Sequence, residues 1–154
     1  MNAFTMIGNY LATSVIAGLL GGSAMLTAMW LMTRGGLAKG NMVVALGGII
    51  TKSRENALRV GLIVHATSAI GFAMVYAMAM LWLGATGMPR ALMIGVAAGF
   101  FHGLVVSLML VWVVAEGHPF EEYNDAGLAV GLSHLTGHIV YGAVVGLVVG
   151  ISPL

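Results

Sequence analysis

The sequence contains no cysteine and very little charge. Its 154 residues include six Lys or Arg, five Asp or Glu, and no Cys. The absence of cysteine excludes disulfide bonds, thiolate metal ligands, iron–sulfur clusters and covalently attached c-type haem. Six basic residues are too few to build a phosphate-binding surface, so nucleic acid is not an expected partner.

Most residues of the chain are apolar. Hydrophobic residues make up 60% of the sequence and charged residues only 7%. An average soluble domain is about 25% charged, so we expect this chain to be surrounded by lipid. The chain has no phosphate-binding loop, dinucleotide fingerprint, nucleophile elbow or pair of catalytic carboxylates. We therefore expect no catalytic activity from the chain on its own.

Four apolar segments are each long enough to cross a bilayer, which takes roughly 20 residues. Backbone groups in lipid must be hydrogen-bonded within their own segment, so all four are predicted to be helices of one bundle. The fold class is thus predicted as all-α, a polytopic membrane protein with a four-transmembrane-helix bundle forming a single domain over residues 1–154. The predicted spans are residues 7–32, 60–83, 91–114 and 127–151.

The basic residues predict the orientation of the bundle. All except Arg90 lie between the first two spans, in a loop at residues 33–59: Arg34, Lys39, Lys52, Arg54 and Arg59. Basic loops stay in the cytoplasm, so this loop and the loop at 115–126 are predicted to be cytoplasmic. The expected location is the cell inner membrane, with the N- and C-termini on the outer, periplasmic side. Within the basic loop, Met42–Ile50 is apolar but too short to span, which indicates an interfacial element, a re-entrant segment or a docking segment for another subunit.

The loop at 115–126 is acidic and contains one histidine, His118. Its acidic residues are Glu116, Glu121, Glu122 and Asp125. Exposed ion pairs are weak, so we expect two solvated loops, with pairing between the basic and acidic loops as the alternative. His118 is likewise expected to lie in a solvated loop, and a surface cation site is the alternative.

The two halves of the chain resemble each other weakly. Residues 18–22 in the first span read Gly-Leu-Leu-Gly-Gly, and residues 99–103 in the third read Gly-Phe-Phe-His-Gly. The second and fourth spans each begin Val-Gly-Leu and continue to a histidine and a threonine, at 60–67 and 130–136. This pattern indicates a duplicated helical hairpin, as in transporters built from parallel repeats. Chance similarity between glycine-rich apolar helices is the alternative.

Four histidines lie inside the predicted spans, where a polar side chain is costly and usually faces the interior of the bundle. They are His65, His102, His134 and His138. At a rise of 1.5 Å per residue, all four fall within roughly 10 Å of depth. His102 and His138 are predicted near the midplane, whereas His65 and His134 lie closer to the cytoplasm.

Our preferred hypothesis is a small integral membrane subunit of a larger redox or respiratory-type complex that binds haem b. Without cysteine, the available axial ligands are His, Met and Tyr. We expect His102 with His138 as the first ligand pair and His65 with His134 as the second. Small residues beside them would leave room for a flat cofactor, or would serve only helix packing. These residues are Gly99, Gly103 and Gly142.

Two other hypotheses stay open. In a purely structural or assembly subunit, the histidines only hydrogen-bond the helices to one another, since a neutral imidazole both donates and accepts. In a metal protein, His134 and His138 chelate copper or zinc together with a third histidine, either His102 or His65. The twelve methionines are interpreted as flexible apolar packing. Under every hypothesis the expected partners are the lipid bilayer and other membrane protein subunits.

Overall fold

The computed structural model describes residues 2–38, 41–114 and 116–154, so Lys39 of the basic loop and Ala115 of the acidic loop lie outside the described residues. Four long helices, counting η1 as the continuation of α4, have the length and composition to cross a membrane. This confirms the predicted all-α, polytopic membrane protein. In chain order the elements are α1 (Ala3–Arg34), α2 (Met42–Thr51), α3 (Arg54–Trp82), α4 (Arg90–Met109), the π-helical turn η1 (Leu110–Val114), the 3-10 turn η2 (Glu121–Tyr123) and α5 (Leu128–Gly150).

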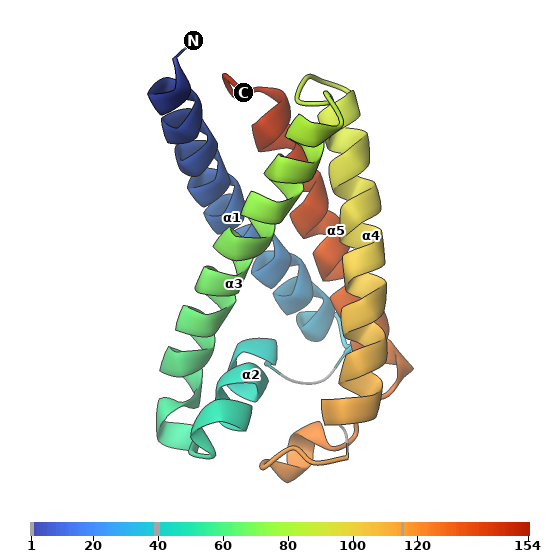
Figure 1. Cartoon of the computed structure of the whole chain (residues 1–154). Coiled ribbons are helices and arrows are strands. Elements are labelled where there is room, and N and C mark those ends of the chain that lie inside the picture. The colour runs from blue at the N-terminus through green and yellow to red at the C-terminus, as the bar shows by residue number, and fades with distance from the viewer. Residues whose placement is uncertain (1, 39–40, 115) are drawn as a thin grey trace.

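The N- and C-termini lie at the same end of the bundle (Figure 1). We call this the terminal end. The opposite end, which carries α2 and residues 116–127, is the loop end. Membrane helices that follow one another along the chain run in opposite directions, and so do α1 and α5 (Figure 1).

α1 and α3 begin before their predicted spans because the polar residues at their N-terminal ends are also helical. The Asn2 side chain caps α1 by accepting a hydrogen bond from the Thr5 amide at 2.8 Å. The second membrane helix begins at Arg54, six residues before the predicted start, with Glu55 in its first turn. A carboxylate there is favourable, since the helix N-terminus carries partial positive charge. The charged residues Arg54 and Glu55 therefore do not mark the end of the helix.

α4 and α5 are in direct backbone contact along a stripe of glycines. A Cβ atom added to Gly95, Gly99 or Gly142 would overlap a carbonyl oxygen of the opposite helix. On Gly146 it would lie 2.9 Å from the Leu92 Cα. Small residues at four-residue spacing permit such close approach in lipid, where packing drives helix association. This stripe makes α4 and α5 one tightly packed hairpin.

The α1–α3 pair uses equivalent glycines in the same way. A Cβ on Gly18 would lie 2.6 Å from the Ile70 Cα and 2.8 Å from the Ala69 oxygen. In the second hairpin, the same atom on Gly99 would meet the backbone of His138 and Ile139. Aligning His65 with His134 aligns Ala69–Ile70 with His138–Ile139. The two hairpins thus share their internal contact as well as their sequence pattern, which supports the predicted duplication.

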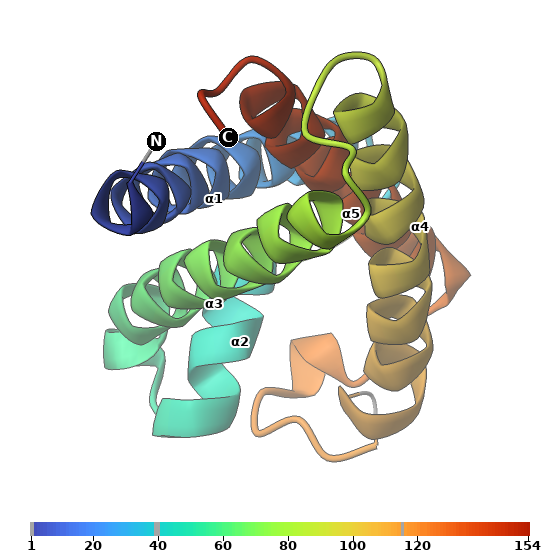
Figure 2. The same ribbon diagram turned by 45° about the horizontal axis from the view of Figure 1, so that its top comes forward.

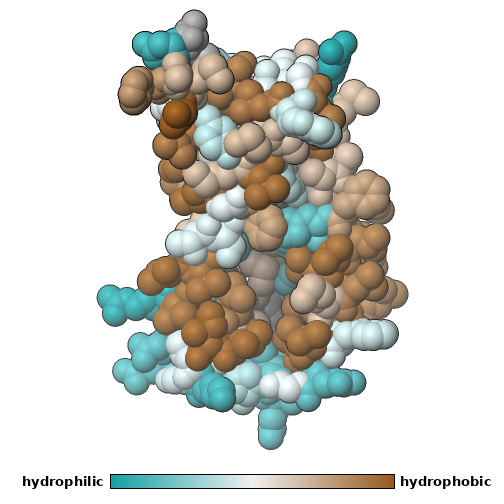
Figure 3. Space-filling view, viewed as in Figure 1, coloured by the Kyte–Doolittle hydropathy of each residue, from teal (hydrophilic) through white to brown (hydrophobic). Residues whose placement is uncertain are grey.

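Towards the loop end α3 diverges from α4. α1 and α3 cross near the middle of the bundle, and below the crossing α3 leans away from the α4–α5 hairpin (Figures 1 and 2). In the space-filling view, a hollow separates the two sides in the lower half of the molecule (Figure 3). The chain around it is largely apolar, with hydrophilic residues gathered at the two ends (Figure 3).

α2 packs against α3 of the same chain. A Cβ on Gly47 would overlap the Ala57 backbone, and one on Gly61 would overlap the Val43 backbone. Of the three placements predicted for Met42–Ile50, the structure therefore shows an intramolecular one at the edge of the bundle.

The two oppositely charged loops are joined, so the expectation of two separately solvated loops was wrong. The Arg54 guanidinium donates to both carboxylate oxygens of Glu122, at 2.5 and 2.6 Å. His118 is 6% exposed and its Nε2–H donates to the Ala45 oxygen of α2 at 3.0 Å. Its Nδ1 accepts from the Phe120 amide at 3.0 Å. The histidine of the acidic loop therefore fastens that loop to α2.

Candidate functional site

A cavity of about 610 Å³ occupies the loop-end half of the bundle. Ligand pockets in proteins typically enclose about 300–1,000 Å³, so this one has the capacity for a large organic group. Residues from all five α-helices line it, together with η1 and residues 122–126. All four histidines predicted as site residues are among them: His65, His102, His134 and His138.

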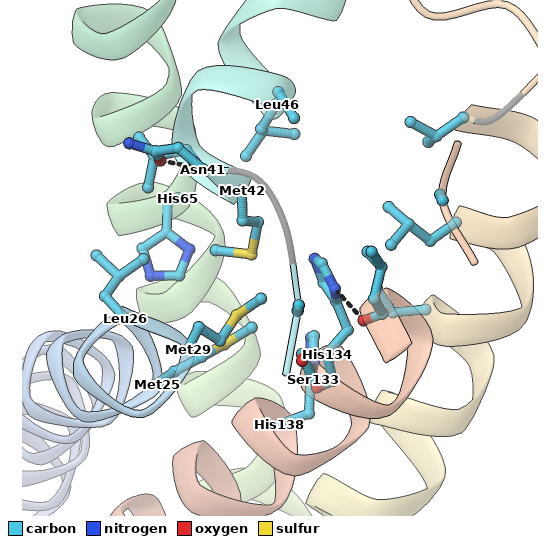
Figure 4. Close-up of a pocket in the computed structure, with 18 of the residues that line it drawn as sticks. Met25, Leu26, Met29, Asn41, Met42, Leu46, His65, Ser133, His134 and His138 are labelled. Atoms are coloured by element: carbon cyan, nitrogen blue, oxygen red, sulfur yellow. Dashed lines mark hydrogen bonds between the residues drawn. The ribbon is translucent and has the colours of Figure 1, made fainter. Parts of the chain in front are cut away.

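His134 and His138 lie on α5 and have the same hydrogen-bond pattern. Their Nδ1 atoms lie 2.9 Å from the Val130 oxygen and 2.8 Å from the His134 oxygen, each four residues earlier on the helix. A carbonyl oxygen only accepts, so Nδ1 carries the proton in both rings and Nε2 does not. Figure 4 shows the His134 bond at the wall of the cavity.

This tautomer is the one that metal-ligating histidines adopt. A hydrogen bond from Nδ1–H to a backbone carbonyl holds the ring in place and leaves the Nε2 lone pair available to a metal. Both side chains are buried, at 5% and 7% exposure. In the described part of the chain, neither Nε2 atom takes part in a hydrogen bond. His134 and His138 are thus two oriented imidazoles with free lone pairs.

His65 and His102 are engaged differently. The His65 Nε2 lies 3.2 Å from the Gly22 oxygen and must donate to it, so this ring ties α3 to α1. The His102 Nδ1 lies 3.2 Å from the Tyr76 hydroxyl. The His102 ring also packs on the Phe72 ring, with centroids 4.1 Å apart. Both histidines line the cavity, and one ring nitrogen of each connects two helices.

Neither predicted pair of histidines encloses a gap in which a porphyrin ring could lie with both histidines as ligands. His102 and His138 are neighbours, as their matched depths predicted, but their rings meet edge to face with centroids 4.6 Å apart. That contact leaves no room for a porphyrin between them. In the second pair, His65 uses its Nε2 on Gly22, while the Nε2 of His134 is free.

The glycines predicted beside a cofactor lie instead between helices. Gly99 and Gly142 belong to the α4–α5 stripe, and a Cβ on Gly103 would lie 2.8 Å from the His138 Cβ and 3.1 Å from the Leu135 Cα. Protein atoms of α5 and α4 fill the space beside them, so their role in this fold is helix packing.

The hypothesis of a three-histidine copper or zinc site finds no matching group. Among residues 2–38, 41–114 and 116–154, no three His, Asp or Glu side chains gather closely enough to hold a metal ion. The four histidines share one cavity, but they are distributed along its walls.

Three methionines also line the cavity, a placement that the sequence did not predict. Met25 and Met29 come from α1 and Met42 from α2. Figure 4 shows the Met25 and Met29 side chains together on the α1 side, across the cavity from His134. The four-residue spacing of Met25 and Met29 was the available signal, since it places both on one helix face.

The loop-end rim of the cavity is polar. Glu122, Tyr123 and Asp125 contribute to its lining. The hydrogen bond from Arg54 lowers the pKa of Glu122 to about 2, and burial raises the pKa of Tyr123 above its usual value. The Arg54–Glu122 pair therefore stays charged at neutral pH and holds the acidic loop beside the rim.

No protein-family model matches the chain, and no curated protein or solved structure matches it either.

Proposed function

We propose that this chain is a small membrane subunit of a larger redox assembly, and that its cavity holds haem b with an α5 histidine as an axial ligand. The observation that carries the proposal is the shared tautomer of His134 and His138. Each ring is fixed through Nδ1 and offers an unprotonated Nε2 from a wall of a cavity of about 610 Å³. An unprotonated imidazole nitrogen is a common axial ligand of haem iron.

The surroundings also suit a membrane cofactor. Apolar side chains dominate the cavity, as is usual for sites that bury a large organic group. Propionates would approach the loop-end rim, where Glu122 is paired with the Arg54 guanidinium. A bound haem would therefore compete with Glu122 for Arg54, so binding is coupled to the position of the acidic loop.

The experiment is purification of the full chain from haem-sufficient membranes, followed by visible spectroscopy and pyridine haemochrome assay. We expect a stoichiometric haem b that is lost or strongly reduced in the double variant His134→Ala/His138→Ala. His65→Ala is the matched control, because the Nε2 of His65 is occupied by the Gly22 oxygen. Wild-type protein without a Soret band would refute the proposal.

The second candidate is a purely structural subunit, and specific hydrogen bonds favour it. His65 links α3 to α1 through Gly22, and the Tyr141 hydroxyl donates to the Ala69 oxygen at 2.6 Å to link α5 to α3. If the buried histidines and Tyr141 serve only to hydrogen-bond the helices, the purified chain contains no cofactor. Replacing His65 then lowers stability, whereas replacing His134 and His138, whose bonds stay within α5, does not.

We also propose that the chain lies in the cell inner membrane with its loop end in the cytoplasm. Arg34, Lys52, Arg54 and Arg59 belong to that end by sequence, and Arg90 alone follows the terminal-end turn. Basic residues are retained on the cytoplasmic side. A cysteine at Leu37, which is 66% exposed, should resist an impermeant maleimide in intact cells and react after lysis. Ready labelling in intact cells would reverse this orientation.

A further inference from the structure

Close contacts between helices shut the cavity along four of its edges. A Cβ atom added to Gly21, Gly22, Gly47 or Gly103 would come within 3.0 Å of an atom of the neighbouring helix. These glycines belong to the α1–α5, α1–α3, α2–α3 and α4–α5 contacts, in that order. Helices that leave no room for a methyl group leave none for a ligand, so no entrance lies at these four contacts.

A cap lies over the loop end of the cavity. It consists of α2 and residues 116–127, and both parts contribute residues to the lining. The Phe120 ring is 6% exposed and lies against α2, since a Cβ on Gly48 would be 2.5 Å from its Cε2 atom. The His118 Nε2–H donates to the Ala45 oxygen at 3.0 Å. These contacts join the two parts of the cap into one packed unit.

α3 and α4 leave the cavity open between them. The two helices diverge towards the loop end, and the hollow in the space-filling view lies between them (Figures 1 and 3). Leu58 and Phe72 of α3 line the cavity and yet are 49% and 43% exposed. Val106 of α4 and Leu110 of η1 line it from the other side and are half-buried. We call this opening, bordered by these four residues, the α3–α4 gap.

The α3–α4 gap faces the hydrocarbon of the membrane. The helices on its two sides, Arg54–Trp82 and Arg90–Val114, are both long and apolar enough to span a bilayer. The four side chains that border it are apolar. A charged or strongly polar molecule that approached through the lipid would lose its hydration there, at a large cost in free energy. The gap therefore admits lipid-soluble molecules in preference to water-soluble ones.

We propose that the ligand of the cavity comes from the lipid phase, through the α3–α4 gap, as a flat and largely apolar molecule. This inference rests on the proposed function, which identifies that molecule as haem b, and adds the route by which it enters and leaves. The apolar ring passes between apolar walls. The propionates keep to the polar loop-end rim, because charge is costly in the hydrocarbon.

The first test asks whether the gap is open to lipid in the full chain without haem, in liposomes. The chain has no cysteine, so Ser68→Cys carries a single nitroxide spin label. Ser68 lines the cavity, is exposed, and lies one helix turn before Phe72 on the same face. We expect the label to be relaxed strongly by oxygen, which concentrates in lipid, and weakly by a water-soluble nickel chelate.

Two further labels calibrate this measurement. Gly71→Cys, on the outer face of α3, should give the same lipid response, and Leu37→Cys, 66% exposed at the loop end, should respond to nickel. A response to nickel at Ser68→Cys would show that the gap faces water. A label there that neither reagent reaches would show that the gap is covered, for example by a second copy of the chain. Either result would overturn the inference.

The second test measures the route itself, as the rate at which the haem-free chain in liposomes takes up haem from donor vesicles. Ser68→Phe places a ring in the gap and should slow uptake about tenfold, which corresponds to a barrier about 1.4 kcal/mol higher. Release of haem to an acceptor protein should slow by the same factor, because the gap serves both directions. Gly71→Phe, outside the cavity, is the matched control and should change neither rate.

The outcomes separate the route from haem binding. Slower uptake with faster release in Ser68→Phe would indicate a damaged site and would overturn the assignment of the route. Faster uptake in His118→Ala, which loosens the cap, together with unchanged uptake in Ser68→Phe, would place the entrance at the loop end instead. A wild-type chain that never binds haem would refute the proposed function, whereas the spin label at residue 68 would still decide whether the cavity opens to the bilayer.

Discussion

Replacing Gly142 by alanine tests the glycine contact that makes α4 and α5 one hairpin. The new Cβ would overlap the Gly95 carbonyl oxygen and lie 2.9 Å from the Gly99 Cα. Both obstacles are backbone atoms, which cannot rotate away as a side-chain end can. Overpacking a well-packed contact costs about 1–3 kcal/mol, occasionally more, so we expect the upper end, about 3 kcal/mol.

Gly71→Ala is the matched control on α3. A Cβ there meets nothing within 4 Å, and the residue is exposed on the outer face. Alanine is favoured over glycine inside a helix by roughly 0.5–1 kcal/mol. The control variant should therefore be unchanged or slightly more stable, and the two identical substitutions should differ in sign.

The assay is reversible unfolding of the purified chain in mixed micelles with increasing sodium dodecyl sulfate, followed by circular dichroism. The free energy of unfolding is compared between wild type and the two variants at the same micelle composition. Equal shifts for Gly142→Ala and Gly71→Ala, or an unchanged free energy for Gly142→Ala, would refute the claim that backbone contact between α4 and α5 stabilises the bundle.

Two further predictions concern polar contacts. Tyr141→Phe removes the hydroxyl that donates to the Ala69 oxygen at 2.6 Å. It should lower the free energy of unfolding in the same micelle assay by about 0.6 kcal/mol, the average for interhelical bonds in membranes, and by no more than about 1.7 kcal/mol. The hydrogen bond from Arg54 lowers the pKa of Glu122 from 4.5 to about 2. The ion pair therefore stabilises the joined loops fully above pH 4.5, and its stabilisation is lost as the pH falls from about 4.5 towards 2. A carbon-13 titration of the Glu122 carboxyl should show the low value in wild type and a return towards 4.5 in Arg54→Gln; an unchanged titration would refute the pairing.

The sequence predicted the helices well because each prediction depends on many residues together. About twenty apolar residues in a row have few alternatives in lipid, and no single residue decides the outcome. The boundaries were less accurate because Arg54 and Glu55 look like loop residues, although charged side chains fit a helix turn that projects from the membrane.

The arrangement of the site could be predicted only in part. Helix rise and direction brought His102 and His138 to one depth, and these rings are in contact. Depth says nothing about the angle around a helix axis, so it could not show that His65 donates to Gly22. It also could not show that Met29 faces α5, because that depends on how α1 crosses α3 and where α3 leaves α4.

The candidate site lies at positions that differ between the two similar hairpins. Pairing Gly18 with Gly99 pairs Gly21 with His102, and pairing His65 with His134 pairs Ala69 with His138. In the first hairpin, Gly21 and Ala69 both serve to receive Tyr141: its ring packs against Gly21, and its hydroxyl donates to the Ala69 oxygen. In the second hairpin, the equivalent positions carry the two histidines that meet at the wall of the cavity.

Both hairpins contribute residues to the cavity, so neither hairpin forms it alone. The α5 imidazoles belong to the second hairpin, and the α1 thioethers that face them belong to the first. The glycines close α4 onto α5 and leave α3 free to diverge, so the space opens between hairpins rather than within one. A ligand bound there would contact both hairpins where α3 diverges from α4. It would therefore stabilise the folded bundle by an amount set by its own affinity and concentration.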